Sequence, residues 1–319
     1  MTVSTQNFIT LQQQINQRVL GQEKSVEQLT IALLAGGHVL LQGLPGLAKT
    51  RSASVMAAQL DSTLNRIQFT PDMLPADITG SELYDSHTQS LTFKKGPVFS
   101  HLVLADEINR APAKVQSALL EAMAESQVSV AGTTHSLPSL FMVLATQNPI
   151  EQEGTYPLPE AQMDRFLMQI IIDYPDKQAE KRMLQMLRRE NLLIQESDSK
   201  LSVDHVLKAR YLVDQVHVSD QVDQYIVDLV DATRYPTLYD VELAQWIEQG
   251  ASPRASIALD KCARAHAWLK GQDHVTPDNV RAVAHSVLRH RLVITFSSQH
   301  QGVNTEHVVN KLLDCVAFA

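Results

Sequence analysis

The sequence lacks long apolar runs and is poor in cysteine, and each shortage excludes a class of protein. No stretch of about 18 apolar residues occurs, so we expect no membrane-spanning helix. Residues 1–14 contain no basic segment followed by an apolar one, which argues against a secretory leader. The two cysteines, Cys262 and Cys315, fit helical apolar patterns without metal-ligand spacing, so we expect reduced thiols in a cytoplasmic protein.

Positive charge is also in short supply. The chain has 27 lysines and arginines against 35 aspartates and glutamates, a formal charge of −8. Such a chain has no broad basic footprint, so binding of free nucleic acid is disfavoured. The 319 residues exceed the usual size of one domain, and a hydrophobic content of 44% is enough for real cores. We therefore expect a globular protein with two domains.

A glycine-rich loop follows a short, mainly apolar run at residues 40–42 and leads into a helix. It comprises Gly43, Leu44, Pro45, Gly46, Leu47, Ala48, Lys49 and Thr50. In such a loop, backbone N–H groups surround phosphate oxygens, the lysine adds positive charge, and the Thr50 hydroxyl ligates Mg²⁺. The general pattern has glycine where this chain has Ala48, which is tolerable if that residue has helical dihedrals. The local alternative is a chance Gly-Pro-Gly turn.

Two carboxylates follow a second apolar run. Residues 102–105 predict a buried parallel strand, and Asp106 and Glu107 emerge at its carboxyl end, where such strands place ligand groups. Asp106 would belong to the Mg²⁺ shell, and Glu107 would polarise the attacking water. A third apolar run at 141–145 leads to Asn148, whose amide would lie beside the carboxylates if the strands are neighbours. A plain turn at Asn148 is the alternative.

The remaining pattern predicts an α/β part followed by helices. A further strand is expected at 65–69, and hairpins at 82–95 and 127–137, with a disordered loop as the alternative for the first. Helices are expected at 7–19, 23–35, 51–60, 108–125, 177–190, 203–216, 221–233, 256–269, 277–291 and 306–316, with a polar connector at 191–200.

Several blocks resemble the MoxR family of AAA+ ATPases. These blocks are Gly43–Thr50, Ala105–Pro112, Gln116–Met123, Ala145–Pro149, Gly154–Phe166 and Gly250–Ala255. The resemblance implies an α/β P-loop core with a five-stranded parallel sheet, followed by an all-helical lid. We expect the core at residues 1–190 and the lid at residues 201–319.

The resemblance also implies roles for individual residues. The adenine segment would be Val19, Leu20, Gly21 and Gln22, and Arg51 and Arg254 would join the loop residues in binding ATP or ADP. Asn148 would be sensor 1, Arg254 sensor 2, and Arg165 the arginine finger given to a neighbouring subunit, all acting in catalysis with Glu107. Locally, Arg254 also fits a helix N-terminus, and Arg165 an ion pair with Asp164 or Glu160.

By the same resemblance, the function is ATP hydrolysis by a homo-oligomeric ring, expected to be hexameric. The ring would remodel or mature client proteins, such as metalloenzymes, with a partner that has a von Willebrand A domain. The alternatives are a chelatase-like motor and a nucleotide-gated scaffold with little hydrolysis; a transcription-activating motor is opposed by the absence of a Gly-Ala-Phe-Thr-Gly-Ala loop. The hairpins would face the pore. Their expected tips, Ser86–Gln89 and Ala131–Thr133, carry no aromatic residue, which favours local remodelling of the client over complete unfolding.

Overall fold

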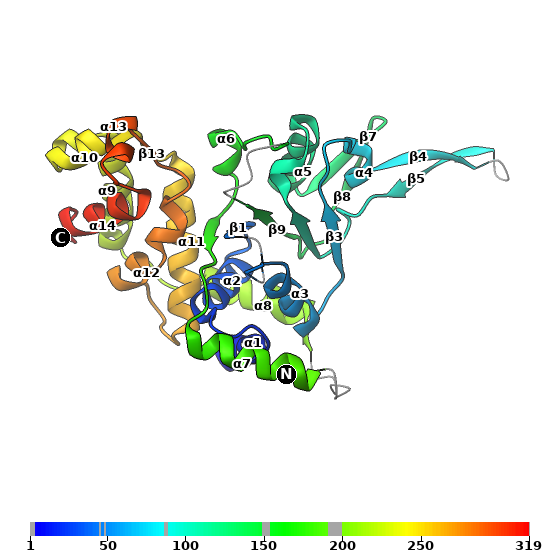
Figure 1. Cartoon of the computed structure of the whole chain (residues 1–319), viewed down its shortest axis with the longest axis horizontal. Helices are drawn as coiled ribbons and strands as arrows, with labels where there is room; N and C mark the ends of the chain where they lie inside the picture. The colour runs from blue at the N-terminus through cyan, green and yellow to red at the C-terminus, as the bar shows by residue number, and fades with distance from the viewer. Residues whose placement is uncertain are drawn as a thin grey trace.

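The computed structural model has an α/β core beside a mainly helical region, with a hairpin arm on the far side of the core (Figure 1). It describes residues 4–44, 46–47, 49–85, 89–148, 154–190 and 200–318. None of the helices in these ranges is long and apolar enough to span a membrane.

The core is built on a five-stranded sheet, as predicted. In spatial order its strands are β10 (Met168–Ile171), β1 (Val39–Gln42), β9 (Met142–Gln147), β6 (Leu102–Asp106) and β3 (Leu64–Gln68). All four pairings are parallel. Strand β6 is buried throughout, which explains its continuous apolar sequence.

Helices cover both faces of the sheet because successive strand residues point to opposite sides. Leu104 and Leu144 pack with the first helices of the chain, whereas Val103 and Val143 pack with the helix that follows the carboxylates. The helices of the core are α1 (Thr5–Arg18), α2 (Glu23–Ala35), α3 (Lys49–Gln59), α4 (Pro75–Thr79), α5 (Ala113–Glu125), α6 (Glu160–Met163) and α7 (Lys177–Glu190). The expected connector falls almost wholly on residues 191–199, which lie outside the described residues.

The helix predicted at 108–125 is wrong at its start. Residues Ile108–Arg110 form a 3₁₀ turn, and α5 begins only at Ala113. Pro112 stands at the helix N-cap, where its missing N–H costs nothing, whereas inside a helix it would remove a hydrogen bond. Glu107 therefore lies outside α5, and its backbone is left-handed instead of helical.

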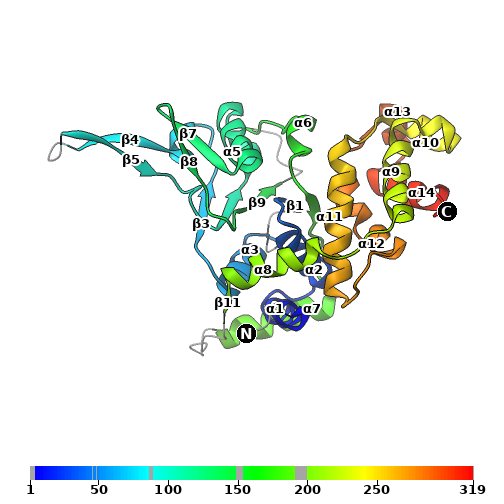
Figure 2. The same cartoon turned by 180° about the vertical axis from the view of Figure 1, so that it is seen from behind.

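Both predicted hairpins are present. Strand β4 (Gly80–Asp85) pairs with β5 (Ser90–Lys95), and β7 (Gln127–Val130) pairs with β8 (Thr133–Ser136). The first hairpin, here called the β4–β5 arm, extends away from the core in both views (Figure 2). Its Phe93 ring stacks on His135 of the second hairpin, with centroids 4.0 Å apart. The expected tip residues 86–88 lie outside the described residues.

The rest of the chain is mainly helical. Its elements are α8 (Val203–Asp214), α9 (Asp220–Arg234), η2 (Pro236–Leu238), α10 (Val241–Trp246), α11 (Pro253–Leu269), α12 (Pro277–Leu288), α13 (Phe296–His300) and α14 (Thr305–Cys315). Four short strands were not predicted: β2 (Leu60–Asp61) pairs with β11 (Leu201–Ser202), and β12 (Ile247–Gln249) pairs with β13 (Val293–Ile294).

The helical region shares a hydrophobic core with the α/β part. Helix α11 packs on α2, and α8 contacts both of them. The Phe8 ring meets Trp268 edge to face at 5.5 Å, a contact that stabilises the fold by about 0.5–1.5 kcal/mol beyond the area that it buries. Because α8 lies against the core, the division into residues 1–190 and 201–319 stays a prediction.

Candidate functional site

The glycine-rich loop lies at the carboxyl edge of the sheet, between β1 and α3. A Cβ atom on Gly43 would lie 2.5 Å from the Ile172 carbonyl oxygen, so this position has no room for a side chain. Gly46 has φ +81°, a conformation that favours glycine. Lys49 Nζ donates to the carbonyl oxygens of Gly43 at 2.5 Å and Gln147 at 3.1 Å. The lysine charge is thus held where β1 and β9 end.

Two predicted residues of this loop, Pro45 and Ala48, lie outside the described residues. The expectation that Ala48 has helical dihedrals therefore stays a prediction. Leu47 is nearly buried, whereas Leu44 is half-buried and packs at the margin of the core. The loop therefore combines side chains that anchor it with glycines that leave its backbone accessible to a ligand.

The carboxylates Asp106 and Glu107 lie at the same edge of the sheet, at the end of β6. Thr146 on the adjacent strand β9 fixes both of them: its hydroxyl donates to Asp106 Oδ1 at 2.6 Å and accepts the Glu107 N–H at 2.9 Å. Glu107 has φ 58° and ψ 52°, a left-handed conformation that costs a non-glycine residue about 1 kcal/mol or more. The Thr146 hydrogen bond helps to hold this strained backbone.

The donor set at this edge fits a magnesium ion. Thr50 Oγ1 lies 3.3 Å from Asp106 Oδ2, so a hydroxyl and a carboxylate oxygen face each other across a short gap. Mg²⁺ prefers oxygen ligands and is commonly held by one or two protein groups together with phosphates and water. Thr50 and Asp106 are therefore the residues that would hold it.

Strand β3 contributes two contacts to the carboxylates that the sequence did not reveal. Arg66 NH2 lies 2.6 Å from Asp106 Oδ2, and Gln68 Nε2 donates to Glu107 Oε2 at 2.8 Å. Arg110 Nε lies 3.1 Å from the same Glu107 oxygen. Both of these contacts on Glu107 fall on its Oε2 atom. The side chain remains 30% exposed and accessible to water.

Asn148 follows β9, which lies between β1 and β6 in the sheet. The strands that carry the amide and the carboxylates are therefore neighbours, as the sequence interpretation required. Asn148 is buried, with 5% of its surface exposed. The alternative, a plain turn at Asn148 and Pro149, falls partly outside the described residues.

The predicted adenine segment packs beside α3 and the start of α7. Val19 is buried and Leu20 half-buried, and Gly21 has φ +76°. A Cβ atom on Gly21 would lie 2.8 Å from the Ala179 Cβ, so a larger residue would displace α7. Gln22 Nε2 donates to the Asp173 carbonyl at 2.7 Å, which ties this segment to the chain leaving the sheet.

Arg51 links the loop helix to the same segment. Its Nε donates to the Arg18 carbonyl oxygen at 3.1 Å, immediately before Val19. This hydrogen bond ties the first turn of α3 to the residue that precedes the adenine segment.

The two predicted catalytic arginines lie elsewhere, at the amino edge of the sheet. Arg165 and Arg254 line a cleft of about 340 Å³ together with Gly37 and Phe141, which precede β1 and β9. The phosphate loop follows β1, so the four residues of that strand, about 13 Å, separate the two edges. Neither arginine lies beside the phosphate loop of its own chain.

This second cleft, here called the arginine cleft, is rich in positive charge. Its lining includes five basic side chains and a single acidic one, Asp164, among the described residues. The basic residues are Arg165, Arg210, Arg254, Lys261 and Arg291. Arg165 and Arg254 are both exposed, so their charge is available to an anion that approaches from outside.

Contacts in the arginine cleft bear on the local alternatives, an ion pair for Arg165 and a helix N-terminus for Arg254. Arg165 NH1 donates to the Leu120 carbonyl at 2.7 Å, and Asp164 pairs with Arg254 at 3.6 Å and with Arg291 at 2.9 Å. Arg254 does stand in the first turn of α11, where the Ser252 hydroxyl accepts its N–H. A helix N-terminus and a binding role are compatible at this position.

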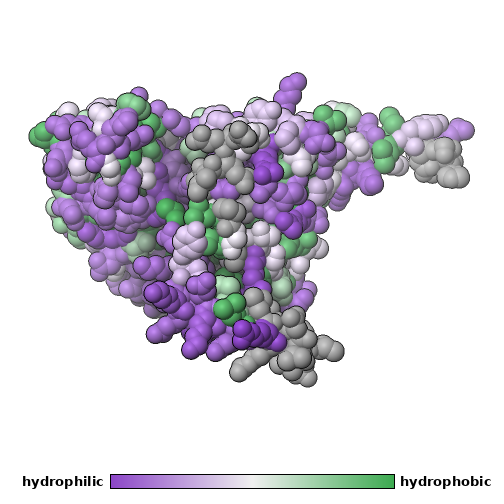
Figure 3. All heavy atoms as spheres, viewed as in Figure 1, coloured by the Kyte–Doolittle hydropathy of each residue, from purple (hydrophilic) through white to green (hydrophobic). Residues whose placement is uncertain are grey.

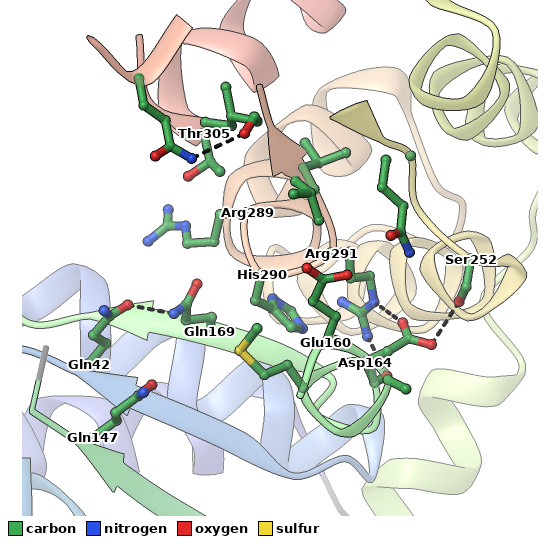
Figure 4. Close-up of a pocket in the computed structure, with 18 residues that line it drawn as sticks. Gln42, Gln147, Glu160, Asp164, Gln169, Ser252, Arg289, His290, Arg291 and Thr305 are labelled. Atoms are coloured by element: carbon green, nitrogen blue, oxygen red, sulfur yellow. Dashed lines mark hydrogen bonds and ion pairs between the residues drawn. The ribbon is translucent and has the colours of Figure 1, made fainter. Parts of the chain in front are cut away.

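A larger cleft of about 780 Å³ connects the two edges along the β10–β1 side of the sheet. Figure 4 shows Gln42 and Gln147, the last residues of β1 and β9, at one end, and Ser252 and Asp164 at the other. His290 lies between them, and its Nε2 is 3.1 Å from the Phe166 carbonyl oxygen. Burial holds the pKa of His290 well below its ordinary value.

Comparisons with known proteins agree with this architecture. Residues 38–168 match the model of the ATPase family associated with various cellular activities (AAA), and residues 243–312 match the AAA lid domain. The chain is 42% identical to Chaperone MoxR1 of Mycobacterium tuberculosis, over 96% of this chain and 80% of that protein. It is 34% identical to protein MoxR of Paracoccus denitrificans, over 96% and 93% of the two chains.

A solved structure is similar throughout. A protein from Cytophaga hutchinsonii, described as a candidate ATPase, has 43% identity and a TM-score of 0.91, covering 99% of this chain and 96% of that one. The matched core carries a phosphate loop, two carboxylates and a buried amide on adjacent strands, which is the arrangement that binds and hydrolyses a nucleoside triphosphate. The chain therefore belongs to the MoxR family of AAA+ ATPases.

Proposed function

We propose that this ATPase works as a ring in which each active site is completed by the neighbouring subunit. One observation carries the proposal: Arg165 and Arg254 lie at the amino edge of the sheet, whereas Lys49, Asp106 and Glu107 lie at the carboxyl edge. If subunits associate head to tail, the arginine cleft of one subunit would face the phosphate loop of the next. Such heterologous contacts form a ring where the rotation from one subunit to the next closes.

Within one subunit, each residue of the carboxyl edge has a task in phosphoryl transfer. The loop backbone and Lys49 would bind the phosphates, and Thr50 and Asp106 would hold Mg²⁺, which would neutralise charge on the phosphate oxygens. Glu107 would orient the attacking water and accept its proton. Asn148, buried between the loop and the carboxylates, would hydrogen-bond the terminal phosphate or the water.

The arginine cleft would add positive charge to that which Lys49 brings to the phosphates. Charge on the transferred phosphoryl group is spread over its oxygens, so catalysis consists largely of placing positive charge around it. Arg165 would act as the finger, and Arg254, held by Asp164, would be a second cation beside it. The excess of basic residues in the cleft supports this role.

We further propose that the ring remodels a client protein. The name of the relative Chaperone MoxR1 supports this role, and the β4–β5 arm offers a surface for it. Tyr84 and Leu91 face each other across the arm and are 65% and 63% exposed, and hydrophobic side chains are visible along it (Figure 3). A hexamer, a cytoplasmic location and a partner with a von Willebrand A domain remain parts of this proposal.

The exposed Tyr84 bears on the expectation that the client is remodelled locally, which was drawn from hairpin tips without aromatic residues. The side chain stands on β4, two residues before the segment that lies outside the described residues. An aromatic residue near the end of the arm is able to pack against an apolar segment of a client.

The test is the ATPase rate per subunit as a function of protein concentration, with the oligomeric state measured at each point. A shared site predicts that the specific rate rises with assembly, because a monomer has no complete site. A constant rate from monomer to ring would refute the shared site. Absence of turnover under all these conditions would favour the nucleotide-gated scaffold.

A further inference from the structure

The Arg66 side chain reaches the oxygen that the magnesium site needs. Arg66 lies on β3, the edge strand of the sheet, and its NH2 is 2.6 Å from Asp106 Oδ2. The same carboxylate oxygen lies 3.3 Å from Thr50 Oγ1. One oxygen therefore faces both the guanidinium and the hydroxyl that would hold the metal ion.

The partners of this ion pair differ in their freedom to move. Asp106 is 10% exposed, and Thr146 fixes its other oxygen at 2.6 Å, so the carboxylate is held in place. Arg66 is 57% exposed at the edge of the sheet. A guanidinium and a divalent cation on one oxygen repel each other, so the exposed Arg66 side chain, rather than the fixed carboxylate, would move away when the ion binds.

The arginine also supports the clamp on Glu107. Arg66 NH2 donates to Gln68 Oε1 at 3.2 Å, and the amide of Gln68 donates to Glu107 Oε2 at 2.8 Å. A chain of contacts thus runs from Asp106 through Arg66 and Gln68 to Glu107. Departure of Arg66 would remove the donor that orients the Gln68 side chain and would weaken one of the two contacts on Glu107 Oε2, the other being that of Arg110.

We propose that Arg66 is a positioning residue that pairs with Asp106 when no Mg²⁺ is bound there and competes with the ion for this carboxylate. Its displacement by the metal ion would couple completion of the metal site to loss of the Gln68 contact on Glu107, leaving that carboxylate held by Arg110. The inference rests on the proposed function in taking Thr50 and Asp106 as the magnesium-holding residues. Arg66 is not assigned any contact with the nucleotide.

The test is a magnesium titration of the binding of a fluorescent ADP analogue, without turnover. Replacing Arg66 by alanine removes the competitor, so the Mg²⁺ concentration at half-maximal binding should fall about two- to fivefold, the range that an exposed ion pair supports. Nucleotide affinity at saturating Mg²⁺ should stay the same. Arg66→Lys, which keeps the charge without the planar fork, should give an intermediate midpoint. Lys208→Ala, which removes an exposed charge on α8, should leave the midpoint unchanged.

Three results would contradict the competition between Arg66 and Mg²⁺. An unchanged midpoint in Arg66→Ala would overturn the competition, and a higher midpoint or weaker binding at saturating Mg²⁺ would show that Arg66 contacts phosphate. If the unaltered protein shows no magnesium-dependent binding, the magnesium site itself is refuted, and the inference with it. Thermal melting of each variant without nucleotide establishes that the compared proteins are folded.

Discussion

Arg254 and Arg291 contact the two oxygens of one carboxylate, that of Asp164, but from opposite environments. The Arg254 side chain is 53% exposed, whereas that of Arg291 is 2% exposed and also donates to the Phe166 carbonyl at 2.6 Å. Burial lowers the pKa of Arg291, and Asp164 opposes that shift. Arg291 therefore stabilises the fold, whereas the Arg254 guanidinium is available to a ligand at the surface.

This difference in exposure predicts that the two alanine substitutions impair different properties, stability for Arg291 and turnover for Arg254. Arg291→Ala should lower the free energy of unfolding by about 3–5 kcal/mol, because it breaks a buried ion pair. Arg254→Ala should change that free energy by less than about 1 kcal/mol, because the pair is exposed, yet should reduce ATP turnover by the assembled protein. Denaturant unfolding and steady-state turnover of both variants measure the contrast. Equal loss of stability in the two would contradict it.

Thr146→Val should impair the active site although the side-chain volume at position 146 is kept. The substitution leaves Asp106 Oδ1 and the Glu107 N–H without the hydroxyl, at an expected cost of about 1–3 kcal/mol in unfolding free energy. Turnover should fall because Glu107 loses its fixed backbone. Thr146→Ser, which restores the hydroxyl, is the control and should recover most of the activity. If valine is as active as threonine, the hydroxyl does not position the carboxylates.

Lys49→Ala and Glu107→Gln should separate nucleotide binding from hydrolysis. The first removes positive charge from the phosphates, so affinity for ATP should fall. The second removes only the group that accepts the proton of the water, so affinity should persist while turnover is lost. Equilibrium binding and single-turnover kinetics distinguish the two. Loss of affinity to the same extent in both variants would be incompatible with the assigned roles.

His38 predicts a loss of stability in mild acid. Burial lowers its pKa to about 4, and the ring is paired on both sides, accepting the Val143 N–H at 2.9 Å and lying 3.1 Å from the Met123 carbonyl. The unfolded chain binds a proton near pH 6.5, whereas the folded protein does so only near pH 4. The stability is therefore complete above about pH 6.5 and falls by about 3 kcal/mol as the pH is lowered to 4.

The measurement is the free energy of unfolding between pH 7 and pH 4, together with the NMR titration of the His38 ring. Buried His290 acts in the same direction, so the ring titration assigns the contribution of His38. A ring that titrates near pH 6.5 in the folded protein would contradict the prediction.

Much of the sheet could be predicted from the sequence, because its central strands are apolar runs that end in polar residues. Residues 102–106 and 142–147 fit that description, and the phosphate loop follows another such run. The predicted helix start at residue 108 was wrong, because apolar periodicity does not reflect the missing N–H of Pro112, after which α5 begins.

The contacts around the carboxylates could not be predicted. Thr146, Arg66 and Gln68 reach Asp106 or Glu107 from strands about 40 residues away in sequence. Such pairs depend on strand order and register, and no local pattern specifies them. The catalytic roles of Arg165 and Arg254 came from family resemblance and stay predictions, and the structure adds their position at the opposite edge.

The measurement that tests the shared site most directly is complementation between two inactive variants. Arg165→Ala keeps an intact phosphate loop, and Lys49→Ala keeps an intact finger. Mixed in equal amounts in one ring, they should form complete sites at up to about a quarter of the interfaces, since each contact is heterologous. Each variant alone should lose a factor on the order of 10³ in rate or more.

The double variant provides the control, because mixing it with either single variant leaves no complete site. Native mass spectrometry establishes that both proteins enter the same ring. Recovery of ATP turnover in mixed rings, and none with the double variant, is the result expected for an active site shared between subunits. Mixed rings that remain inactive, or dilute monomers that hydrolyse ATP at the full rate per subunit, would contradict it.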